Sequence, residues 1–112
     1  RLELALKTLA DIDTMRTHAR LLQLAASAPA AEQLDALLER DPDNRAAALQ
    51  RIALAITGDD YQAAFDTLMK QLKTAAPGER EFLNKVMLAL FNLLGEDSEL
   101  TKRFRKLYLD QL

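Results

Sequence analysis

The side chains that could support acid–base chemistry are few. The chain has 112 residues, a single histidine, His18, and no cysteine. General acid–base catalysis needs a titratable side chain within hydrogen-bond reach of a partner group. His18 follows Met15 by three residues and precedes Leu22 by four, which places it on or near the apolar face of a helix. This position favours a packed histidine over a catalytic one, so we predict no catalytic residue and no enzyme activity.

Carboxylates are the other candidates for metal chemistry, but their positions suit helix caps. With one histidine and no cysteine, the sequence cannot assemble a zinc site of the usual ligand types. Asp41, Asp43, Asp59 and Asp60 lack the loop spacing of a calcium-binding hand. All four border expected helix starts, where a side-chain oxygen can accept backbone N–H groups. We therefore predict no metal and no cofactor.

A short basic run near the C-terminus could suggest nucleic-acid binding. Lys102, Arg103, Arg105 and Lys106 surround Phe104, a combination that could contact phosphates and stack on a base. On a helix, however, Phe104 falls on the inner stripe and the basic side chains point to its flanks and to solvent. The net charge of −2 and pI near 5.4 provide no general attraction for a polyanion. The sequence predicts no nucleic-acid partner.

The composition indicates one all-helical domain. Hydrophobic residues make up 49% of the chain and aromatic residues 5%, and most of the apolar residues are Leu and Ala, which favour helices. No apolar run is long enough to cross a bilayer and no secretory signal is present. We expect residues 1–112 to form a single all-α domain with a cytoplasmic location and no membrane partner.

The first third of the chain predicts three helices. Leu2, Leu6 and Leu9 follow helical spacing, so residues 1–10 read as half of a hairpin that lacks its neighbour. The Asp11-Ile12-Asp13 segment interrupts this pattern, and Asp13 or Thr14 could cap a helix that ends near Ser27. A third helix should run over 30–40 and end before Pro42. Residues 14–40 are therefore expected to form one helical repeat.

The clearest hairpin lies at 43–76. Asp43 or Asn44 supplies an N-cap, and Gly58 ends the helix, with the left-handed conformation that glycine tolerates expected there. Asp59 or Asp60 can cap the next helix, and the Pro77-Gly78 pair closes the unit. A helix, a tight turn and a second helix packed back on the first are predicted.

The last unit, 79–112, contains two more helices. The first ends at Gly95, and Asp97 or Ser98 caps the second. The inner stripe of this terminal helix consists of Leu100, Phe104, Leu107, Tyr108 and Leu112. Comparable helix starts recur at roughly 30 to 35 residues, the period of helical-hairpin repeats that stack into solenoids. We predict antiparallel helical hairpins stacked as a short tetratricopeptide-like solenoid of about six helices.

The same segments carry a family resemblance. The turns at 41–44 and 58–65, followed by the stretches 90–95 and 103–107, resemble in their order the C-terminal tetratricopeptide region of bacterial thioredoxin-like co-chaperones, the chaperedoxins. The resemblance covers most of the chain from Thr14 onward. It implies that the chain is part of a longer protein in which a thioredoxin-like domain comes first. That domain and any Cys-x-x-Cys motif are absent from these residues.

The resemblance also implies a function and partners. Such proteins act as holdases that bind unfolded clients and pass them to chaperonin, and their C-terminal end docks the chaperonin. On this sequence, the partner-binding residues would be Leu100, Phe104, Leu107 and Tyr108 or the basic flank of Lys102, Arg103, Arg105 and Lys106. The alternative is a generic tetratricopeptide adaptor that holds one specific peptide or subunit. Self-association through the N-terminal half repeat is a further prediction.

Overall fold

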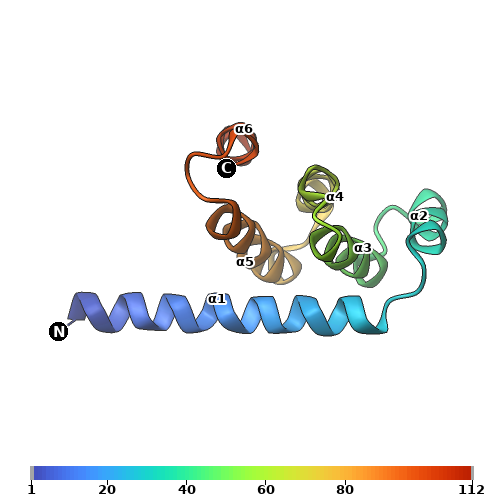
Figure 1. Ribbon diagram of the computed structural model, residues 1–112. Helices are drawn as coiled ribbons and strands as arrows, with labels where there is room; N and C mark the ends of the chain where they lie inside the picture. Colours follow the sequence, from blue (N-terminus) through green and yellow to red (C-terminus); the bar gives the residue numbers. More distant parts are fainter. Residues whose placement is uncertain (1, 112) are drawn as a thin grey trace.

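The computed structural model describes residues 2–111 and consists of six helices joined by short turns (Figure 1). The predicted all-α fold with about six helices is confirmed, and residues 2–111 contain no strand. Arg1, the start of the predicted half repeat, and Leu112, the end of the predicted terminal stripe, lie outside the described residues. The helices are α1 (Leu2–Ser27), α2 (Ala31–Arg40), α3 (Arg45–Thr57), α4 (Tyr61–Thr74), α5 (Pro77–Leu94) and α6 (Glu99–Asp110).

The predicted break at Asp11-Ile12-Asp13 is wrong, because α1 is one continuous helix of 26 residues. Neither Asp13 nor Thr14 caps a helix. The Thr14 hydroxyl donates to the carbonyl oxygen of Ala10 at 3.0 Å, a bond made inside a helix, and the Asp13 carboxylate pairs with Lys85 of α5 at 3.4 Å. Aspartate costs a helix interior only a fraction of a kcal/mol, on the order of 0.7 relative to alanine, so two aspartates without Gly or Pro cannot end it.

The predicted caps of α3, α4 and α6 are confirmed. The side-chain oxygens of Asn44, Asp60 and Ser98 each accept the backbone N–H three residues further along. The expected left-handed conformation lies at Asp59 (φ 59°), and Gly58 has φ −92°. The Asp59 carboxylate also accepts a hydrogen bond from the Tyr61 hydroxyl at 2.9 Å, and this bond is the main cause of the raised pKa of Tyr61. The left-handed residue of this turn is therefore Asp59, one position after the glycine that the sequence analysis expected.

The helices form three tiers (Figure 1). α1 lies across both α3 and α5, and α4 and α6 lie on the far side from α1. α4 packs between α3 and α5 and also contacts α6. α2 packs on α3 and not on α1, so the two helices of the predicted 14–40 unit do not form a packed pair. The division into units at 14–40, 43–76 and 79–112 remains a prediction.

The core is built mainly by α3, α4 and α5 and is closed by α6. Phe65 of α4 lies at its centre, with the Phe104 ring of α6 stacked on it at 4.6 Å between centroids and the Phe91 ring of α5 at 5.6 Å. Of the 26 residues of α1, only Thr17 and Leu21 are buried. The N-terminal half of α1 therefore projects beyond the core, as the long helix extending past α5 shows (Figure 1).

Candidate functional site

An apolar groove lies where α1 crosses α3 and α5. It has a volume of about 220 Å³, and each of the three helices contributes three residues. They are His18, Leu21, Leu22, Ala53, Ile56, Thr57, Ala89, Leu90 and Leu93. Leu22 and Leu93 stand at its rim with exposed fractions of 62% and 47%. Large aliphatic side chains left in water beside a concave apolar surface are typical of a binding site.

His18 is a wall residue of this groove. It is half-buried beside Leu21 and Leu22, and no hydrogen bond or ion pair links it to another side chain within residues 2–111. The described residues also contain no group of three metal-ligating side chains. The position of His18 agrees with the interpretation from the sequence, which placed it on the apolar face of its helix.

The predicted partner-binding residues of α6 divide into an inner and an outer set. Phe104 is 2% exposed and belongs to the core, and Leu100 and Tyr108 are half-buried against it. The Tyr108 hydroxyl donates to the Asn84 side-chain oxygen at 2.7 Å, which ties the C-terminal part of α6 to α5. The predicted inner stripe is therefore confirmed for Leu100, Phe104 and Tyr108, which close the end of the core, and is wrong for Leu107, which is 43% exposed.

The outer set is Lys102, Arg103, Lys106 and Leu107, all exposed. Lys102 lies 3.8 Å from Glu99, a weak surface pair. Arg103 donates to the side-chain oxygen of Gln62 at 3.3 Å, and its guanidinium lies 5.1 Å from the centre of the Phe104 ring. Arg105 is separate from them: it is half-buried, and its guanidinium lies 5.5 Å from the centre of the Phe91 ring. A partner approaching α6 from solvent would meet the outer set first.

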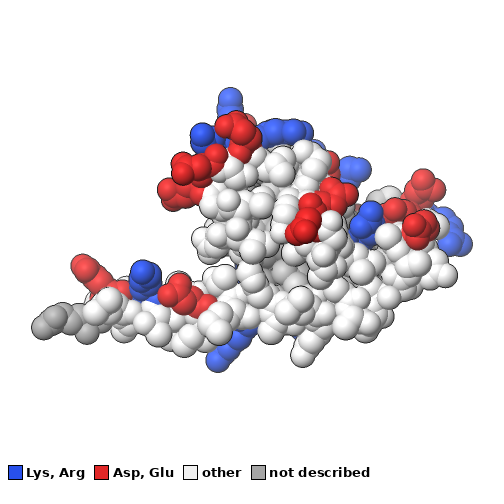
Figure 2. Space-filling model, viewed as in Figure 1, with Lys and Arg blue, Asp and Glu red and all other residues white. Residues whose placement is uncertain are grey.

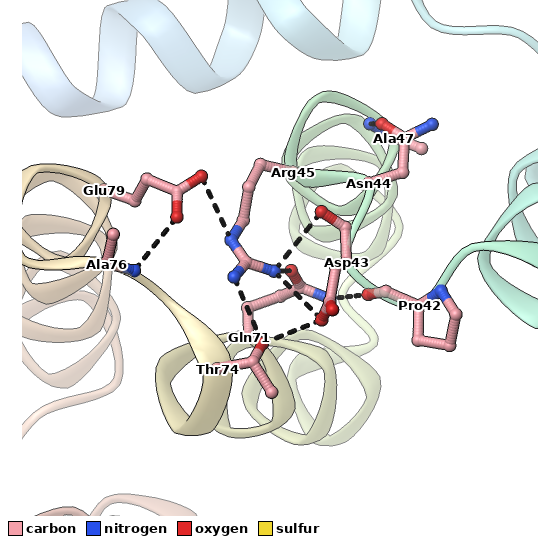
Figure 3. A network of polar contacts seen from close by, with 9 residues as sticks. All are labelled: Pro42, Asp43, Asn44, Arg45, Ala47, Gln71, Thr74, Ala76 and Glu79. Atoms are coloured by element: carbon pink, nitrogen blue, oxygen red, sulfur yellow. Dashed lines mark hydrogen bonds and ion pairs between the residues drawn. The ribbon is translucent and has the colours of Figure 1, made fainter.

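A polar network around Arg45 holds the central hairpin to the next one, and the sequence did not reveal it (Figure 3). The Arg45 guanidinium donates to the side-chain oxygens of Gln71 at 2.6 Å and Thr74 at 3.1 Å, at the end of α4. It also pairs with Asp43 at 3.5 Å and with Glu79 of α5 at 3.4 Å. Because its partners on α4 and α5 are 26 to 34 residues away, sequence spacing could not identify them.

One local signal could have drawn attention to Arg45. It is the first residue of α3, where positive charge opposes the helix macrodipole and is unfavourable unless a partner compensates for it. Gln71 completes the network, because its amide donates to the carbonyl oxygen of Pro42 at 2.8 Å in the turn before α3. The network links the start of α3 to the end of α4 and the start of α5, and α3 and α5 form two walls of the apolar groove.

This architecture defines a class of protein. Short helices packed on one another in a helical-repeat fold, with a groove across them, are typical of scaffolds that bind other proteins through surface complementarity. The family model described as Tetratricopeptide repeat matches residues 24–109, and the chain belongs to this family. Comparisons with curated proteins and with solved structures gave no significant match. None of the described helices combines the length and the apolar character needed to span a membrane.

Proposed function

We propose that this chain is the repeat domain of a thioredoxin-like co-chaperone that holds non-native proteins and presents them to chaperonin. The observation that carries the proposal is the apolar groove, whose rim leaves Leu22 and Leu93 exposed to solvent. The order of the turns and terminal helices along the sequence adds support, because it resembles the tetratricopeptide region of those co-chaperones.

The groove chemistry fits a non-native client. A partly unfolded protein exposes aliphatic segments that are buried in its native state. The groove offers aliphatic walls from three helices and almost no hydrogen-bonding groups, with His18 and Thr57 as its only polar side chains. Such a surface selects for apolar character more than for one sequence, because fixed hydrogen bonds provide most of the orientation in a specific site. This is the behaviour required of a holdase.

In this proposal, the outer set of α6 is the surface that contacts chaperonin. Lys102, Arg103 and Lys106 present positive charge, and Leu107 adds an aliphatic contact that is 43% exposed. Charged rims accelerate and orient association, whereas apolar contacts supply most of the affinity. Because Phe104 belongs to the core, removing α6 as a whole would uncover Phe65, so surface substitutions are the cleaner way to test this contact.

The holdase role can be tested by light scattering from a heat-denatured enzyme mixed with the chain. We expect the wild type to suppress aggregation and the double variant Leu22→Ser/Leu93→Ser to lose most of that effect. Leu37→Ser is the matched control, because Leu37 is an exposed leucine of α2 outside the groove. If the wild type leaves aggregation unchanged, the holdase proposal fails and an adaptor for one specific peptide becomes the better interpretation.

The chaperonin contact needs a separate measurement. In a pull-down with purified chaperonin, the triple variant Lys102→Gln/Arg103→Gln/Lys106→Gln should be retained less than the wild type, and the loss should shrink at high salt, where surface charges are screened. Equal retention of both proteins at low salt would exclude the basic outer set as the docking surface.

A further inference from the structure

A second concave site lies nearer the N-terminal half of α1, between α1, α5 and α6. We call it the lateral cleft; its volume is about 420 Å³. It shares no lining residue with the apolar groove. Its residues are Ala10, Asp13, Thr14, Thr17, Lys85, Leu88, Phe91, Asn92, Arg105, Tyr108 and Leu109. In Figure 2, the charged side chains visible on the projecting half of α1 gather on the edge that faces α5 and α6.

The lateral cleft has one more cation than anion among its lining side chains, Lys85 and Arg105 against Asp13. Lys85 and Asp13 pair across it at 3.4 Å and largely cancel. Arg105 remains: no carboxylate pairs with it, and none of its nitrogens donates a side-chain hydrogen bond, within the described part of the chain. A half-buried guanidinium is partly stripped of water, so leaving it without an anion has a cost that a carboxylate ligand would remove.

The position of Arg105 suits recognition of an anion. Its guanidinium is held 5.5 Å from the centre of the Phe91 ring, and the same ring meets the edge of Tyr108 at 6.3 Å between centroids. Tyr108 is fixed in turn by its hydrogen bond to Asn84. An arginine stacked on a ring loses little freedom when it binds, and its planar fork matches the two oxygens of a carboxylate.

Aliphatic side chains flank this cation. Leu88 of α5 and Leu109 of α6 both line the lateral cleft and are 54% and 57% exposed. We propose that the lateral cleft binds a peptide segment of a partner protein that carries a carboxylate beside leucine-sized side chains. The carboxylate pairs with Arg105, and the aliphatic side chains cover Leu88 and Leu109. This site is independent of the client-holding role proposed for the apolar groove.

The test uses a defined probe, the fluorescein-labelled peptide Gly-Ser-Leu-Glu-Leu-Ser-Gly, and fluorescence anisotropy. We expect saturable binding that weakens about tenfold when glutamine replaces the glutamate, the effect of losing one charged hydrogen-bonded pair. A peptide with serine in place of both leucines should also bind more weakly. Arg105→Gln should weaken binding of the glutamate peptide about tenfold and leave binding of the glutamine peptide unchanged.

Two further variants separate recognition from folding. Lys106→Gln is the matched control, because Lys106 neighbours Arg105 but does not line the lateral cleft, and it should bind like the wild type. Leu109→Ser changes an exposed side chain, so it should keep the fold by circular dichroism and weaken binding. The proposal is overturned if the glutamate peptide does not bind, if it binds Arg105→Gln equally well, or if the glutamine peptide binds as tightly. It is also overturned if the cleft instead pairs two copies of the chain, seen as a dimer that Leu109→Ser dissociates.

Discussion

Replacing Phe104 measures how much of the fold depends on the closure by α6. The Phe104 ring is 2% exposed and lies 4.6 Å from the Phe65 ring with an angle of 8° between their planes. Truncating a fully buried phenylalanine to alanine costs about 3–5 kcal/mol, from lost burial and from the cavity left behind. The folded state of a small domain is stable by only about 5–15 kcal/mol, so Phe104→Ala should remove a large part of the free energy of unfolding.

Urea unfolding followed by circular dichroism provides the measurement. With a denaturant slope of about 2 kcal/mol per M, the loss corresponds to a midpoint lower by about 2 M. Leu107→Ala is the matched control on the same helix, because Leu107 is 43% exposed and should change the free energy of unfolding by about 0.5 kcal/mol or less. If Phe104→Ala shifts the midpoint no more than Leu107→Ala, then α6 does not close the core and the assignment of the inner stripe is refuted.

Three other changes test separate parts of the structure. Thr101 is fully buried and its hydroxyl has no hydrogen-bond partner within residues 2–111, so Thr101→Val should raise the free energy of unfolding by about 1 kcal/mol, measured by thermal denaturation. The control is Thr17→Val, which removes a hydroxyl that donates to the Asp13 carbonyl oxygen. A gain of the same size in the control would refute the explanation. Arg45→Ala should lower the free energy of unfolding, measured in urea, by about 2–3 kcal/mol. Arg51→Ala breaks one ion pair with an exposed carboxylate and should lower it by about 1 kcal/mol or less. Equal losses would argue against a stabilising role of the Arg45 network. Self-association through the projecting half of α1 predicts a dimer in sedimentation velocity that Leu6→Glu dissociates, and a monomer at all concentrations would contradict it.

Helix ends were the most predictable part of the fold. Asn44, Asp60 and Ser98 are short polar residues placed one residue before apolar-periodic segments, and each accepts the expected backbone N–H. These interactions span only three residues, so local sequence determines them. The predicted break at Asp11-Ile12-Asp13 was wrong because the local preference of aspartate against a helix interior is weak. The contact of Asp13 with Lys85, 72 positions further along, is compatible with a continuous helix.

The candidate sites were predictable only in part. The sequence singled out the α6 residues 100–108 because their pattern lies on one helix, and the structure then divides them into core, outer set and the arginine of the lateral cleft. The sequence did not reveal the apolar groove or the lateral cleft, because each combines residues of α1 with residues of helices that lie much later in the chain. Nothing in the spacing of Leu22 and Leu93 indicates that they meet at one rim.

The amino-acid sequence by itself determined the helical class, the positions of most turns and the membership in a repeat family, because periodicity and capping act over a few residues and recur from unit to unit. Only the tertiary structure decided that α1 crosses both α3 and α5, that Arg45 ties the hairpins together and that Arg105 lies on a ring without a carboxylate partner in the described residues. These features depend on packing between distant segments, where many weak contacts together determine the arrangement of the helices and no single pair of residues predicts it.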